Sequence, residues 1–135
     1  MTPVDQTSFG SHRWPYFEPG DCLSACVATL LDLPARCVPH FLDERDPCDE
    51  IWAMRLDAWL SRLGVPVQHF ILHPEGHGDL GAVAPPRPYV LCGTSILGCE
   101  HAVVARGEEI IFDPHPSRLG IERAHRMIVL GGPRW

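Results

Sequence analysis

The sequence contains no lysine and no asparagine, so all 11 of its basic residues are arginines. Side-chain amides come only from Gln6 and Gln68, which shortens the list of residues able to donate an amide hydrogen bond in a site. No stretch approaches the roughly 18 to 20 apolar residues of a membrane span. Residues 1–17 also lack the basic start and apolar run of an export signal. We therefore expect a cytoplasmic protein without a membrane partner.

Length and charge narrow the class further. The chain has 135 residues, of which 45% are hydrophobic and 21% are charged, with a formal net charge of −6. A chain of this size and composition buries enough surface for one folded domain, so we expect a single domain over residues 1–135. The net negative charge argues against a nucleic-acid partner, because binding to phosphates depends on a positively charged surface.

Hydrophobic periodicity predicts helices first and strands afterwards. Residues 1–20, rich in Gly, Pro and Ser, indicate an arm that packs Trp14, Tyr16 and Phe17 onto the body. Apolar residues then recur at helical spacing, which predicts a helical part over 21–64, and alternate with polar residues afterwards, which predicts a sheet part over 65–135. We expect helices from Asp21 to the stop at Pro34 and over 47–63, and strands over 67–72, 89–92, 101–105, 109–112 and 127–130. This order predicts an α+β domain with a small antiparallel sheet.

The second predicted helix and the segment between the first two predicted strands allow more specific predictions. The second helix places five apolar side chains on one face, which predicts core packing by Trp52, Leu56, Trp59, Leu60 and Leu63. Residues 73–88, rich in Gly and Pro, predict a surface loop.

The cysteines pose the central question about function. There are six: Cys22, Cys26, Cys37, Cys48, Cys92 and Cys99. Without an export signal they are expected to be free thiols, metal ligands or a nucleophile rather than disulfides. Cys22 falls in the first turn of the predicted helix, behind the helix-capping acid Asp21. Unpaired N–H groups and the helix dipole favour a thiolate there, so we expect a lowered pKa and a nucleophilic Cys22.

A histidine and an acid lie close together in the predicted hairpin. If the turn is centred on Gly107, His101 faces Asp113 across the two strands. A register slip of one residue would put the two side chains on opposite faces. The arrangement supplies what a thiol hydrolase needs: a nucleophile, an imidazole that takes and returns the proton, and a group that orients the imidazole.

Further residues complete this hypothetical site. The backbone of Cys22, with the amide of Gln6, is expected to stabilise an oxyanion. Substrate binding is expected from Thr94 and Ser95 in the GTSILG loop and from His115 and Ser117 after the hairpin. The substrate would be a peptide or a protein, and no metal or cofactor is required.

The order of these residues resembles the papain-like cysteine peptidases, including the leader-peptidase domains of bacteriocin exporters. It is also similar to short bacterial and phage proteins with a Gly-Asn-Cys opening, a VPHF-like segment and a HAVV…DPHPS ending. Here these read GDCLSAC, VPHF at 38–41 and HAVV…DPHPSRLG from His101. The resemblance implies a papain-like fold with Cys22 as nucleophile, His101 as base, Asp113 as orienting acid and Gln6 as oxyanion donor. Leu23 stands where leader peptidases have glycine, so their double-glycine specificity is not implied.

Other readings remain open from the residues alone. The same residues serve an acyl transferase, or a non-catalytic peptide-binding module on the same fold. His115 is an alternative base, and Cys92 with Cys99 is an alternative disulfide. A structural zinc site is the remaining alternative, with ligands drawn from Cys22, Cys26, Cys37, Cys48, His40, His73 and His77.

Overall fold

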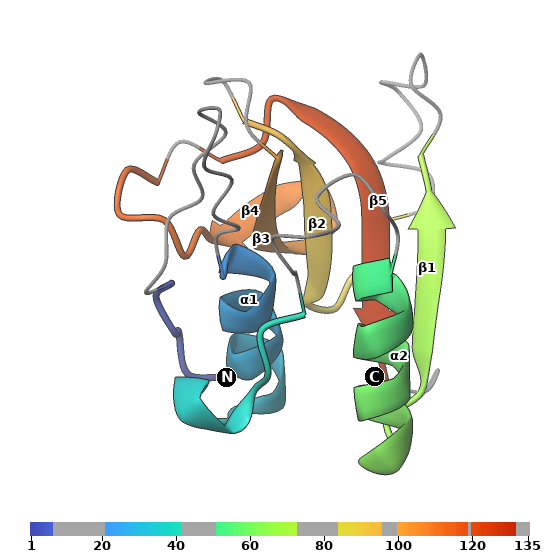
Figure 1. Cartoon of the computed structure of the whole chain (residues 1–135). Helices are drawn as coiled ribbons and strands as arrows, with labels where there is room; N and C mark the ends of the chain where they lie inside the picture. The colour runs from blue at the N-terminus through green and yellow to red at the C-terminus, as the bar shows by residue number, and fades with distance from the viewer. Residues whose placement is uncertain (7–20, 42–50, 73–83, 96–99, 119, 132–135) are drawn as a thin grey trace, which may run out of the picture.

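The computed structural model of the chain describes residues 1–6, 21–41, 51–72, 84–95, 100–118 and 120–131. These residues form an α+β fold of two α-helices and one five-stranded antiparallel sheet, as predicted (Figure 1). None of the described helices is long and apolar enough to cross a membrane. The predicted arm with Trp14, Tyr16 and Phe17, most of the predicted 73–88 loop, and Cys48, His73, His77 and Cys99 lie outside the described residues.

The two α-helices and five strands coincide with predicted ones, β4 at the predicted bounds and the others with shifted ends, whereas a short 3₁₀ helix was not predicted. The elements are α1 Cys22–Leu31, a short 3₁₀ helix η1 Ala35–Cys37, α2 Ile51–Arg62, β1 Val67–Ile71, β2 Tyr89–Thr94, β3 Glu100–Arg106, β4 Glu109–Phe112 and β5 Arg123–Leu130. The strand order in the sheet is β1-β5-β2-β3-β4. Strand β5 begins at Arg123 rather than at Met127, because its polar first half carries no apolar alternation but pairs with the end of β2.

Helix α1 is buried along almost its whole length. Its residues from Cys22 to Thr29 are all buried, which is typical of a helix inside the core rather than on the surface. The helix ends at Asp32, which adopts a left-handed conformation (φ 57°) two residues before Pro34. At the other end Asp21 occupies the N-cap position, but its side chain makes no capping hydrogen bond, so the predicted capping role is wrong.

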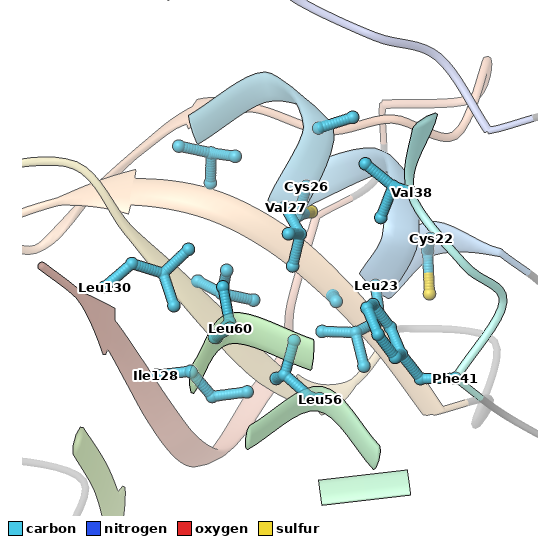
Figure 2. Close-up of a cluster of buried hydrophobic side chains, with 14 residues drawn as sticks. Cys22, Leu23, Cys26, Val27, Val38, Phe41, Leu56, Leu60, Ile128 and Leu130 are labelled. Carbon is cyan, nitrogen blue, oxygen red and sulfur yellow. The ribbon is translucent and has the colours of Figure 1, made fainter. Parts of the chain in front are cut away.

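Both helices pack on one face of the sheet. The larger core cluster joins α1 and α2 to side chains of β2, β3 and β5, and Figure 2 shows Val27, Leu56, Leu60 and Ile128 within it. The opposite face is formed by a strand-only cluster that includes Tyr89, Val103 and Met127. From the predicted stripe of α2, Leu56 and Leu60 are buried and Trp52 and Trp59 are partly buried. Leu63, just beyond the helix, is 51% exposed, which corrects its assignment to the core.

The hairpin of β3 and β4 does not have the predicted register. Counted from the turn, the Cα partners are Arg106 with Glu109, Ala105 with Ile110 and Val104 with Phe112. At the turn, each residue of β3 pairs with the residue one position further along β4 than predicted. A bulge between Val104 and Ala105 shifts the pairing by one more position along β4. Because side chains alternate with a period of two, the two displacements together preserve which residues share a face.

A glycine allows close contact between β2 and β5. Gly93 pairs with His101 on β3 and with Ala124 on β5, beside a register shift between Cys92 and Gly93. A Cβ atom at position 93 would lie 2.1 Å from the carbonyl oxygen of Arg123. Only glycine fits here without separating β2 from β5, and β2 is the strand that pairs with His101 on β3.

Candidate active site

The structure brings His101 and Asp113 together. The Nε2 atom of His101 lies 2.7 Å from Oδ1 of Asp113, and the two side chains are only 10% and 4% exposed. His101 comes from the start of β3, and Asp113 follows β4 directly. The predicted contact is therefore present, although it arises from a register different from the predicted one.

Asp113 is held as a carboxylate by several donors. Its Oδ1 atom accepts a second hydrogen bond from the backbone N–H of His115 (2.9 Å), and Oδ2 accepts one from the N–H of Gly120 (2.7 Å). Burial alone would raise the pKa of Asp113, but the hydrogen bonds from His101, His115 and Gly120 outweigh it and hold the pKa below its ordinary value. Because an ionised carboxylate can only accept, Nε2 of His101 carries the proton of this hydrogen bond.

Cys22 opens α1 beside the strand that carries His101. The backbone N–H of Ala102, the residue after His101, hydrogen-bonds the Cys22 sulfur. The thiol is nevertheless buried, with 8% of Cys22 exposed. Burial raises the pKa of Cys22 to about 11, while the hydrogen bonds from Ala102 and Leu23 lower it only in part. The predicted lowering of this pKa is wrong, because loss of hydration outweighs the helix terminus.

Two further thiols lie near Cys22. Cys26 is one turn along α1 and fully buried, and Cys92 is the β2 partner of Ala102. Burial raises the pKa of both, and the charge of Cys22 adds to the effect. The charge of Asp113 is a smaller contribution that also raises the pKa of Cys26. Cys22, Cys26, Cys37 and Cys92 are all free thiols.

No metal site forms within the described part of the chain. There, no group of three or more His, Cys, Asp or Glu side chains is placed to hold a metal ion. Among the ligands considered for zinc, Cys22 and Cys26 lie in the core, whereas Cys37 is exposed and His40 lies on the surface beyond η1.

Gln6 reaches this region through its backbone. The N–H of Gln6 donates to the carbonyl oxygen of Pro114 (3.2 Å), and Gln6 is 6% exposed. Two residues earlier, the N–H of Val4 donates to Oγ1 of Thr29 on α1 (2.9 Å). The N-terminal segment therefore runs from α1 to the residue that follows Asp113.

His115 lies next to the His101–Asp113 pair but is not oriented by it. The His115 and His101 rings meet edge to face, with centroids 6.1 Å apart. Asp113 binds the ring of His101 but only the backbone N–H of His115, whose Nδ1 accepts from the N–H of Ser117 (3.0 Å). Of the two candidate bases, His101 is the one whose ring is bound by Asp113, which fixes its tautomer.

Of the other predicted binding residues, Thr94 and Ser117 have hydrogen-bond partners and Ser95 is buried. Oγ1 of Thr94 lies 2.7 Å from Nε2 of His125 on β5, and Ser95 is buried. Ser117 is exposed, with its N–H bound to His115.

Three residues of this region escaped sequence reasoning: Asp5, Gly93 and Gly120. The only signal for Gly120 is its place at the end of the DPHPSRLG run, where a positive φ of 76° lets its N–H face Asp113. Asp5 and Gly93 contact segments far away in the chain, so no local pattern reveals them.

Comparison of the chain with protein-family models, curated proteins and solved structures finds no match.

Proposed function

We propose that this protein is a cysteine-dependent hydrolase of peptide or amide bonds, with a papain-like arrangement of Cys22, His101 and Asp113. One observation carries the proposal. The thiol that opens α1 is hydrogen-bonded by the residue next to a partly buried histidine, and a carboxylate orients that histidine. A nucleophile, a base and an orienting acid are the three groups that such a reaction needs.

The protonation states suggest how the first step proceeds. With a pKa of about 11, Cys22 rests as a thiol rather than as a preformed thiolate. Its proton passes to Nδ1 of His101 as the sulfur attacks the substrate carbonyl carbon, and the carbonyl electrons move to the oxygen. Asp113 accepts the hydrogen bond from Nε2 throughout and stabilises the imidazolium that forms.

The remaining steps return the site to its starting state. The C–N bond breaks, and the proton on Nδ1 of His101 goes to the leaving amine, which leaves a thioester on Cys22. Water then attacks the thioester carbon while Nδ1 of His101 takes a proton from the water. The C–S bond breaks, Nδ1 gives that proton to the Cys22 sulfur, and the acid leaves. The N–H of Cys22 and the amide of Gln6 are the proposed oxyanion donors. If an amine replaces water in the second half, the same groups carry out acyl transfer.

The burial of Cys22 favours a second candidate, a non-catalytic peptide-binding module on the same fold. A thiol that is 8% exposed, with a pKa raised to about 11, is a poor nucleophile unless a base and a substrate activate it. In this alternative His101 and Asp113 are a structural pair and Cys22 is a core residue.

Acylation of individual cysteines distinguishes the two candidates. The protein is treated with an activated ester of a short acylated amino acid, and the thioesters are mapped by mass spectrometry after proteolysis. Cys37 is an exposed thiol and serves as the internal control. A hydrolase is acylated first at Cys22, in spite of its burial, and turns the ester over. Acylation at Cys37 with none at Cys22 would support the binding module and contradict the hydrolase.

A further inference from the structure

The segment after β4 is wrapped around Asp113. The backbone N–H groups of His115 and Gly120 both donate to the Asp113 carboxylate, so two residues that follow β4 hold it from the backbone. Within this turn the N–H of Arg118 donates to the carbonyl oxygen of His115 (3.0 Å). Arg118 adopts a left-handed conformation with φ 53°, which is costly for a residue with a Cβ atom. A strained arginine in this turn indicates that its side chain is held by strong contacts.

The guanidinium of Arg118 makes three such contacts. One Nη1 hydrogen bond goes to the backbone carbonyl oxygen of Asp113 itself. The same nitrogen lies 2.9 Å from Oδ1 of Asp5, and the guanidinium carbon lies 5.2 Å from the ring centre of Phe112. Arg118 therefore links the carbonyl oxygen of Asp113 and the ring of Phe112 to Asp5 in the N-terminal segment.

Asp5 is itself fixed in place by its neighbours. The N–H of Val4 donates to Thr29 on α1, and the N–H of Gln6 donates to Pro114. Asp5 lies between these two anchors, so its carboxylate offers Arg118 a fixed partner even though both side chains are about half exposed. An isolated exposed ion pair contributes little to the free energy of folding. Here the same guanidinium also makes a backbone hydrogen bond and a ring contact.

We propose that Arg118, anchored by Asp5, is a positioning residue that holds Asp113 against His101. The role is indirect: Arg118 fixes the backbone of Asp113, and the carboxylate of Asp113 fixes the tautomer of His101. The proposal deepens the proposed hydrolase, because it names what keeps the base oriented. It also holds for a non-catalytic chain, since the His101–Asp113 pair is present without a substrate.

The test is a nuclear magnetic resonance measurement on the full chain without a substrate. ¹⁵N-labelled histidine reports whether His101 carries its proton on Nε2, and how fast that proton exchanges with solvent. The measurement is made on Arg118→Gln and on Asp5→Asn, with Arg106→Gln as the control. Arg106 is an exposed arginine at the β3–β4 turn, at the other end of β3 from His101. Because no reaction is followed, the outcome is independent of whether Cys22 is a nucleophile.

We expect the Nε2 proton of His101 to exchange about tenfold faster or more in Arg118→Gln, and faster to a smaller degree in Asp5→Asn. Both variants would also show a mixture of the two His101 tautomers, while Arg106→Gln matches the parent protein. An unchanged tautomer and exchange rate in both variants would overturn the proposal. If Arg118→Gln does not fold, the Asp5→Asn spectrum decides by the same criterion.

Discussion

Replacing Asp113 by asparagine tests the electrostatic account of the site. The carboxylate accepts three hydrogen bonds, from the His101 ring and from the backbone N–H groups of His115 and Gly120. An asparagine has one carbonyl oxygen and one NH₂ group, so in this nearly closed position one of the three donors faces another donor. A buried unsatisfied donor costs about 1 to 3 kcal/mol, and the other two hydrogen bonds lose their charge assistance. We expect Asp113→Asn to lower the free energy of unfolding by about 2 to 4 kcal/mol at pH 7.

The pH dependence gives this prediction a second readout. The pKa of Asp113 is lower in the folded chain than its ordinary value, so ionised Asp113 stabilises the fold. This contribution is complete above about pH 4 and is lost as the pH falls through the folded pKa. Urea unfolding of both proteins at pH 7 and near pH 3 measures it. The difference between parent and variant should shrink at the lower pH. A loss below about 1 kcal/mol at pH 7, or a difference that does not change with pH, would refute the reasoning.

Two further predictions concern packing and reactivity. We expect Gly93→Ala to cost about 3 kcal/mol or more, because its Cβ atom would meet the Arg123 carbonyl oxygen, which cannot rotate away. The control is Gly107→Ala, where φ is positive (57°) but no atom lies within 4 Å of the added Cβ. We expect this variant to lower the free energy of unfolding by about 1 to 2 kcal/mol. Similar urea midpoints for the two variants would contradict the argument. In the resting protein, alkylation of Cys22 by a haloacetamide should rise about tenfold per pH unit from pH 7 to pH 10, because its pKa is about 11. A rate at Cys22 that stays flat down to about pH 6, measured by peptide mapping beside the exposed Cys37, would instead indicate a preformed thiolate.

Local patterns predicted most of the elements and one contact of the site. Helical spacing and strand alternation are properties of the chain itself, so the order of two helices and five strands follows from them. The contact of His101 with Asp113 was predicted from a wrong register. It forms because the shifted turn and the bulge at Val104 displace the pairing in the same direction. Nothing in the apolar pattern marks that bulge.

The chemistry of Cys22 shows what a local pattern leaves out. Its place at the start of α1 is visible in the sequence, and the N–H groups there do lower its pKa. The desolvation that dominates comes from the core packed around α1, which includes Phe41 and side chains of the sheet. In the same way, the contact between Asp5 and Arg118 joins the first residues of the chain to a turn near its end. Such tertiary contacts determine charge states and orientations, and no periodicity encodes them.

The most direct test of the proposed function is the rate at which Cys22 is acylated in a single turnover. The parent protein is mixed with an activated ester and compared with His101→Ala. The control is His69→Ala, because His69 pairs with Asp57 and lies on β1, at the other edge of the sheet from β4. Loss of the general base should slow acylation of Cys22 by about 10² to 10⁴-fold in His101→Ala and leave His69→Ala close to the parent. Equal rates in the parent and His101→Ala, or no thioester on Cys22 in the parent, would contradict the account.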